Sequence, residues 1–201
     1  IVTGGAGFIG SHMVDLLLSK KYKVIVIDNL VGGHKKNIFK HIKNKNFFLK
    51  KIDIRKKIKD TRLFKNVDYV YHFAGIGDIV PSIEQPNNYM MTNVQGTVNV
   101  LEAARRAKVK KFVYAASASC YGKTKNIVAE NTTISLEHPY ALSKYLGERA
   151  AFHWNKVYGF FQYLGFSPGR YLGLSVNTLF IIWTSFIGLS IIRSTSDLNK
   201  I

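Results

Sequence analysis

The sequence predicts an α/β protein built on a doubly wound parallel sheet with helices on both faces. Two observations carry this prediction. Short apolar runs rich in β-branched residues alternate with longer segments whose apolar residues recur at helical spacing. A glycine-rich turn also separates the first apolar run from the first helical segment. Strands and helices that alternate in this way form parallel sheets covered on both sides.

The elements follow from these periods in chain order. Ile1 and Val2 end a first strand, and Met13, Leu16 and Leu17 then mark one face of a helix. Uninterrupted apolar runs are typical of buried parallel strands. The expected strands are 1–2, 23–27, 47–52, 69–73 and 111–116, and later helices are expected from about 94 to 104 and from about 140 to 154. Pro139 suits the first turn of the last helix.

Size and composition narrow the class of protein. The 201 residues are 47% hydrophobic, which suffices for a sizeable core. Cys120 is the only cysteine, so no internal disulfide can form, and a reducing, cytoplasmic location is favoured. No signal-peptide pattern precedes the first strand.

The formal charge of +17 has two interpretations. A lysine-rich stretch at 20–65 could contact nucleic acid or an anionic membrane. We favour a solvated lysine-rich surface, because no recognition motif accompanies the charge, and we expect no nucleic-acid partner. The histidines at 12, 34, 41, 72, 138 and 153 lack metal-ligand spacing, so no metal is expected, and His72 is interpreted as a hydrogen-bonded core residue.

The glycine-rich turn carries the first functional signal. Gly4, Gly7 and Gly10 stand between a strand and an amphipathic helix, where glycine lets the backbone approach a pyrophosphate closely. The free N–H groups of the helix start then face the phosphates. A second strand ends in Asp28, 18 residues after Gly10. This arrangement predicts a Rossmann-type dinucleotide site.

Asp28 selects between the two nicotinamide cofactors. A carboxylate at the end of the second strand can accept hydrogen bonds from both adenosine ribose hydroxyls, and it would repel a 2′-phosphate. The sequence therefore predicts NAD as the cofactor rather than NADP.

Tyr140 and Lys144 are the candidate catalytic pair. They lie four residues apart on a predicted helix and so share one face. A phenol has a pKa of about 10, which a nearby ammonium would lower. Tyr140 could then exchange a proton with a sugar hydroxyl as general base and general acid.

Several motifs together resemble the extended short-chain dehydrogenase/reductase family of NAD-dependent epimerases and dehydratases that act on nucleotide sugars. The resemblance runs from residue 1 to about 159 and is closest to the UDP-glucose 4-epimerases. The motifs are TGGAGFIG, VIDNL, Asp53-Ile54, HFAG at 72–75, NVQGT at 93–97, SASCYG at 117–122 and HPYALSK at 138–144.

The resemblance implies further cofactor contacts. Phe8 and Ile9 would line the pyrophosphate, and Asp53 and Ile54 would meet the adenine. Asn93 would open the helix behind the active site. The complete set expected to bind NAD is Gly4, Gly7, Phe8, Ile9, Gly10, Asp28, Asn29, Leu30, Val31, Gly32, Gly33, Asp53, Ile54, Phe73, Ala74, Gly75, Asn93, Tyr140 and Lys144.

The same resemblance narrows the reaction. Ser117 would complete the catalytic group with Tyr140 and Lys144, and Ser117 and Tyr140 would contact the substrate. Dehydratases of the family carry an Asp-Glu pair where this chain has Ala118 and Ser119. The implied activity is therefore 4-epimerisation of a UDP-sugar through a transient 4-keto sugar. A dehydratase, a decarboxylase and an inactive NAD-binding fragment remain alternatives.

The chain divides near residue 160 in this interpretation. Residues 1–159 form the NAD-binding domain, and 160–201 form an unrecognised apolar tail without continuing strands or helices. The uncharged run at 171–192 is long enough to span a membrane, but we favour an out-of-frame or degenerate tail. We therefore expect a sheet incomplete at both ends, a missing substrate domain and no turnover by this chain alone. The intact family member is expected to be a homodimer.

Overall fold

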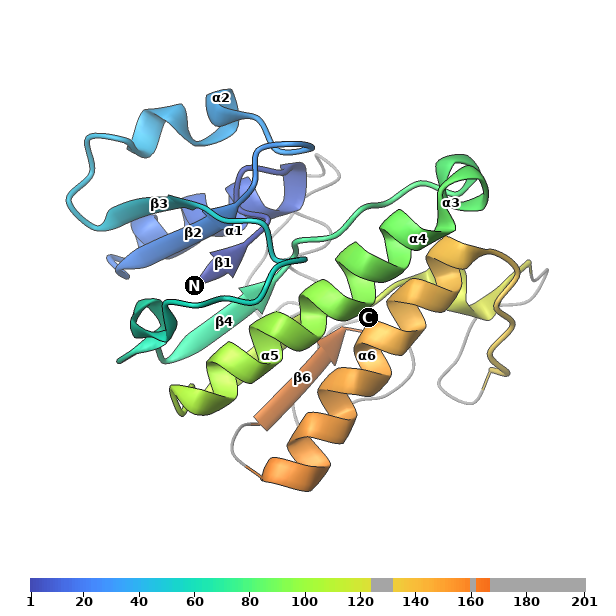
Figure 1. Cartoon of the computed structure of the whole chain (residues 1–201). Helices are drawn as coiled ribbons and strands as arrows, with labels where there is room; N and C mark the ends of the chain where they lie inside the picture. Colours follow the sequence, from blue (N-terminus) through green and yellow to red (C-terminus); the bar gives the residue numbers. More distant parts are fainter. Residues whose placement is uncertain (124–131, 160–161, 167–201) are drawn as a thin grey trace, which may run out of the picture.

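The computed structural model describes residues 1–123, 132–159 and 162–166, and Figure 1 shows their arrangement. A parallel sheet has the strand order β3-β2-β1-β4-β5-β6. The strands are β1 (Val2–Thr3), β2 (Val24–Asp28), β3 (Phe47–Lys51), β4 (Tyr69–His72), β5 (Lys111–Ala115) and β6 (Gln162–Phe166). The predicted doubly wound parallel sheet is confirmed.

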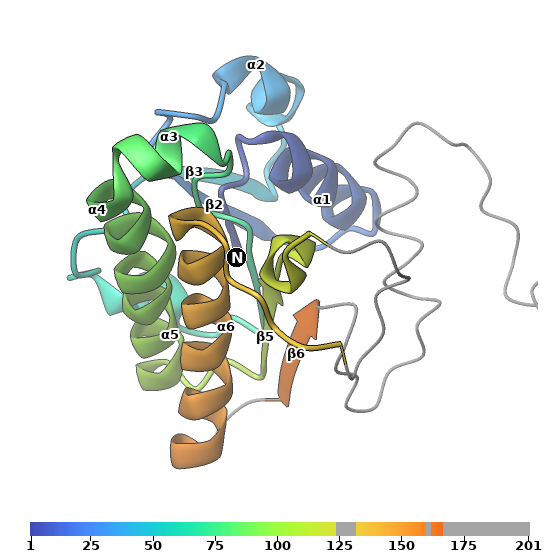
Figure 2. The same ribbon diagram turned by 90° about the vertical axis from the view of Figure 1, so that its right-hand side faces the viewer.

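The helices lie on both sides of this sheet, with α1 on one side and α5 and α6 on the other (Figure 2). The longer helices are α1 (Phe8–Ser19), α5 (Gly96–Arg106) and α6 (Pro139–Tyr158). Shorter helices are α2 (Lys35–Ile38), α3 (Val80–Glu84) and α4 (Pro86–Tyr89). Single turns are η1 (Phe39–His41), η2 (Thr61–Phe64), the π-helical η3 (Met90–Gln95) and η4 (Ala118–Tyr121).

Each face of the sheet has its own apolar core. Met13 and Val14 of α1 pack with Val26 of β2 on one face. Leu101 of α5 packs with Phe112 of β5 on the other. The winding direction reverses between β1 and β4, the point at which doubly wound sheets bind ligands.

The predicted first strand is shifted by one residue. Residues 1–2 were expected, whereas β1 is Val2–Thr3, and both of its residues are fully buried. The strand pairs in parallel with β2 on one side and with β4 on the other, at the centre of the sheet.

The expectation that no strand follows residue 160 is wrong. β6 pairs in parallel with β5 over five register positions, from Lys111 opposite Gln162 to Ala115 opposite Phe166. Its sequence, QYLGF, contains a glycine and no β-branched residue, and only Tyr163 and Phe166 are of types that favour strands. The hydrogen bonds to the open edge of β5 decide its conformation. The uncharged run at 171–192 lies outside the described residues, and within them no helix is long and apolar enough to cross a bilayer.

Candidate functional site

The glycine turn follows β1 directly and adopts a backbone that requires glycine. Gly4 has a φ of +68°, and a Cβ atom there would lie 2.6 Å from the backbone nitrogen of Ala74. A Cβ atom on Gly10 would lie 2.7 Å from Cα of Gly5. The turn therefore packs against both the loop after β4 and its own helix. Helix α1 begins after Gly7 without a side-chain cap. The start of a helix carries the positive end of its dipole and is a favourable place for an anion.

A cleft of about 510 Å³ opens beside this turn. Most of the predicted cofactor residues line it, namely Gly4, Gly7, Phe8, Ile9, Gly10, Asp28, Asn29, Val31, Gly32, Gly33, Ile54, Phe73, Ala74 and Gly75. The structure adds residues that the sequence analysis did not name: Ile27, Ile52, Arg55, Ile76, Gly77, Asn88 and Thr92. A cradle of backbone and small residues at this position fits an extended, phosphate-containing ligand.

Asp28 lies at the carboxyl end of β2 and is buried in the wall of the cleft. Its Oδ2 accepts a hydrogen bond from the N–H of Ala6 at 2.9 Å, and its Oδ1 accepts one from the N–H of Leu30 at 2.8 Å. A Cβ atom on Gly33 would lie 2.8 Å from Oδ2. These contacts hold the carboxylate in place, and its remaining lone pairs can still accept hydrogen bonds from ribose hydroxyls.

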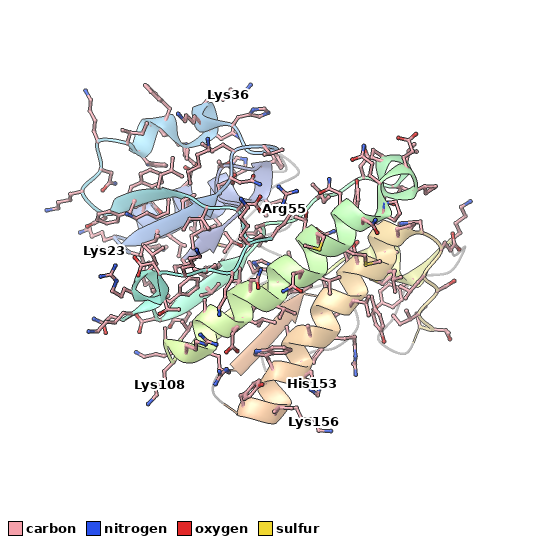
Figure 3. The ribbon with its side chains drawn as sticks, viewed as in Figure 1. Lys23, Lys36, Arg55, Lys108, His153 and Lys156 are labelled. Atoms are coloured by element: carbon pink, nitrogen blue, oxygen red, sulfur yellow. The ribbon has the colours of Figure 1, made fainter. Side chains whose placement is uncertain are left out.

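Two predicted cofactor residues are directed elsewhere. Leu30, at a φ of +64°, packs against the apolar core beside α1 instead of lining the cleft. The carboxylate of Asp53 forms an ion pair with Arg55 at 2.6 Å. That hydrogen-bonded guanidinium holds the pKa of Asp53 below its usual value. Arg55, which is labelled in Figure 3, also donates to Oδ1 of Asn88 at 3.2 Å. Arg55 lines the cleft, whereas Asp53 does not.

Asn93 does not open a helix, which corrects the expectation. It lies inside a continuous helical stretch from α4 through η3 to α5, within the π-helical turn. Its buried side chain exchanges two hydrogen bonds with the backbone of Ile76 and donates a third to the Ser143 hydroxyl at 2.9 Å. It therefore connects the loop after β4 to helix α6. Turns of π-helix occur often at functional sites.

Helix α6 carries the predicted catalytic pair. His138 caps its first turn, because Nδ1 accepts the Ala141 N–H at 3.1 Å, and Pro139 occupies the first turn as expected. The Tyr140 ring stacks on that of His138 at 6.0 Å between centroids. The Lys144 ammonium lies 4.4 Å from the ring centroid of Tyr114, and burial lowers the pKa of Lys144 to about 8.

Ser117 follows β5, where its side chain caps η4. Its Oγ accepts a hydrogen bond from the Ser119 N–H at 3.2 Å. This bond uses a lone pair, so the hydroxyl hydrogen can still be donated to a substrate oxygen. Ser117, Tyr140, Lys144 and Asn93 do not line the cleft itself. Among the described residues, no group of His, Cys, Asp and Glu could hold a metal ion.

A glycine turn with an acidic residue at the next strand end, in a doubly wound sheet, defines a dinucleotide-binding domain of the Rossmann class. The NAD dependent epimerase/dehydratase family model matches residues 1–177. The chain therefore belongs to that family, as its motifs predicted.

Three similar proteins illustrate the family. The putative UDP-glucose 4-epimerase of Methanocaldococcus jannaschii is 42% identical over 162 residues, which are 79% of this chain and 52% of that protein. The dTDP-glucose 4,6-dehydratase of Streptomyces venezuelae, solved with NAD bound, has a TM-score of 0.76 and 32% identity over 82% of this chain and 54% of its own.

The UDP-glucose 4-epimerase of Thermotoga maritima, solved with UDP-glucose, has a TM-score of 0.74 and 32% identity, and covers 82% of this chain and 53% of its own. The chain thus spans about half the length of the relatives that it matches.

Proposed function

We propose that this chain binds NAD in the cleft beside the glycine turn and supplies the catalytic group of a UDP-sugar 4-epimerase. The proposal rests on where the structure places the cleft relative to helix α6. The uncapped start of α1, Asp28 and the loop after β4 surround the cleft, and helix α6 with Tyr140 and Lys144 is tied to that loop through Asn93.

Different parts of the cleft would bind different parts of NAD. The N–H groups at the start of α1 would bind the pyrophosphate, because they carry the positive end of the helix dipole. Asp28 would accept hydrogen bonds from the adenosine ribose. Arg55 and Asn88, on the wall beside Ile54, would border the adenine.

The catalytic half uses groups of α6 and the loop after β5. Bound NAD supplies reversible hydride acceptance from C4 of the sugar. Tyr140 would take the proton of the 4-hydroxyl and return it after the 4-keto sugar has turned over. Ser117 would donate a hydrogen bond to the reacting oxygen, and the charged form of Lys144 would favour the phenolate of Tyr140.

Asp28 is the residue on which cofactor choice should depend. We expect the wild-type chain to bind NAD more tightly than NADP, because the buried carboxylate would repel a 2′-phosphate. In Asp28→Ala, NAD binding should weaken by about 10- to 100-fold, as for charged hydrogen bonds worth about 1.5–3 kcal/mol, and the preference should shrink. Fluorescence or calorimetric titration with both cofactors measures this.

Asp28→Asn is the matched control for that experiment. The amide oxygen can still accept one of the two backbone N–H groups, so Asn preserves part of the loop structure while removing the charge. We expect Asn to lose the discrimination against NADP while remaining more stable than Ala. A wild-type preference for NADP, or a preference unchanged in both variants, would contradict the role of Asp28.

A 4,6-dehydratase is the second candidate, because a solved dehydratase is as similar in structure as the epimerases are. Elimination of water needs an additional acid and base, and Ala118 and Ser119 cannot supply them. In a chimera of residues 1–159 with the C-terminal half of the M. jannaschii relative, UDP-glucose should yield its C4 epimer. NMR detection of a 4-keto-6-deoxy sugar would instead favour the dehydratase.

A further inference from the structure

A chain of hydrogen bonds runs from β1 through His72 of β4 to helix α5. The N–H of Ala74 donates to Oγ1 of Thr3 at 3.2 Å, and Thr3 contacts Nδ1 of His72 at 2.7 Å. On the other side of the ring, Nε2 lies 2.9 Å from Oγ1 of Thr97, whose hydroxyl donates to the Asn93 carbonyl at 2.6 Å. Thr3, His72, Thr97 and Asn93 are all at most 2% exposed.

The hydroxyl hydrogens determine the direction of the chain. Thr97 donates its only hydroxyl hydrogen to the Asn93 carbonyl and also lies within hydrogen-bonding reach of the Tyr114 hydroxyl, whose own hydrogen goes to the Lys144 carbonyl. No hydrogen is left for His72, so Nε2 carries the ring proton and Thr97 accepts it. Nδ1 then accepts from the Thr3 hydroxyl, while Thr3 accepts the N–H of Ala74. Burial lowers the pKa of His72 to about 3, which agrees with a neutral ring.

The chain continues into helix α6. Asn93 Nδ2 donates to the Ser143 hydroxyl at 2.9 Å, and Ser143 donates to the Tyr140 carbonyl at 2.8 Å. The helix comes close enough for this because Gly147 lacks a side chain: a Cβ atom there would lie 2.9 Å from the Asn93 carbonyl oxygen. Asn93 therefore joins the two parts: its backbone carbonyl accepts from Thr97, and its side-chain amide donates to Ser143 as well as to the Ile76 carbonyl.

We propose that His72 and Thr97 are positioning residues, which hold the helix carrying Tyr140 and Lys144 in register with the phosphate turn. Thr3 immediately precedes Gly4, and Tyr140 begins the catalytic face of α6, so the chain joins the two halves of the site. The inference rests on the proposed function in so far as both halves contact one cofactor.

A residue that only filled space at position 72 would not need hydrogen bonds to Thr3 and Thr97. The ring centroids of Phe112 and Tyr114, both on β5, lie 5.6 and 5.8 Å from that of His72, so an apolar side chain would also pack there. A buried polar network is costly unless every member is satisfied, and this one is satisfied in a single direction. That direction specifies one tautomer, which packing alone would not.

The matched pair Thr97→Val and Thr97→Ser tests the inference in the 201-residue chain. Val has nearly the shape of Thr but no hydroxyl, whereas Ser keeps the hydroxyl. We expect Thr97→Val to weaken NAD binding by about tenfold or more, since it breaks a buried hydrogen-bond chain. ADP lacks the nicotinamide half and would contact the turn, Asp28 and the adenine wall but not α6, so its binding should stay within about twofold. Thr97→Ser should restore NAD binding. Titrations are made at a temperature where all three proteins are folded.

A ligand-free measurement keeps the inference separate from the proposed function. In wild type and Thr97→Ser, the imidazole ¹⁵N chemical shifts should show a neutral His72 with its proton on Nε2. In Thr97→Val, that tautomer should be lost, and the amide signals of residues 140–144 should shift. A proton on Nδ1 in wild type, or unchanged α6 signals in Thr97→Val, would overturn the inference. If the signals behave as expected but wild type binds NAD no more tightly than ADP, the proposed cofactor contacts of α6 fail instead.

Discussion

Replacing Tyr140 by Phe should abolish epimerisation in the chimera of residues 1–159 with the C-terminal half of the M. jannaschii relative. Phe keeps the ring that stacks on His138 but removes the hydroxyl that would take and return the sugar proton. General acid–base groups contribute about 10²- to 10⁴-fold in rate, so the epimerisation rate should fall by that factor. NAD affinity should be nearly unchanged. A coupled assay of epimer formation and a cofactor titration measure the two effects.

Tyr145→Phe is the matched control on the same helix. Tyr145 lies five residues after Tyr140 and therefore projects from a different face of α6. The same loss of a hydroxyl should leave epimerisation within about twofold of wild type if only Tyr140 moves the proton. Activity of Tyr140→Phe within tenfold of the parent chimera would rule out Tyr140 as the base, because it would fall short of the expected contribution.

Gly4→Ala should destabilise the domain and abolish NAD binding. The backbone at Gly4 is left-handed, which costs a non-glycine residue about 1–2 kcal/mol. The new methyl group would also lie 2.6 Å from the Ala74 nitrogen and 2.8 Å from its Cα, and backbone atoms cannot rotate away as a side chain can. We expect the free energy of unfolding to fall by about 3 kcal/mol or more, as measured by urea denaturation.

Gly32→Ala separates this effect from a general sensitivity of the cleft. Gly32 also lines the cleft, but a Cβ atom there would have nothing within 4 Å, and its φ is not in the left-handed region. Its substitution should change the free energy of unfolding by less than about 1 kcal/mol. Equal losses in the two variants would show that the close packing of Gly4 against the loop after β4 has no special importance.

Local sequence patterns were sufficient for the parts of the site that a short segment builds alone. The glycine turn, the helix after it and Asp28 at the end of β2 all lie within 28 consecutive residues, and the structure places them around one cleft. Helical spacing also predicted that Tyr140 and Lys144 share one face of a helix, and both lie on α6, while their catalytic role stays a prediction. The predictions for Leu30 and Asp53 were less accurate. Leu30 packs against the apolar core beside α1, and Asp53 forms an ion pair with Arg55.

Contacts between distant segments decided the rest. β6 forms where the edge of β5 offers hydrogen bonds, although QYLGF contains a glycine and only two residues that favour strands. Asn93 looked like a helix start, but Ile76 and Ser143 bind its side chain in the middle of a helical stretch.

For His72, the sequence predicted the burial, and contacts between distant segments decided the hydrogen-bond partners. Its sequence position predicted a buried, hydrogen-bonded residue, and that prediction is confirmed. Its partners, Thr3 and Thr97, are 69 and 25 residues away, and neither spacing nor propensity encodes them. By itself the sequence determined the periods, the glycine turn and the acidic strand end, because these depend on neighbouring residues. Tertiary structure alone decided which buried polar groups meet, because a buried donor takes whichever acceptor the packed elements bring within reach.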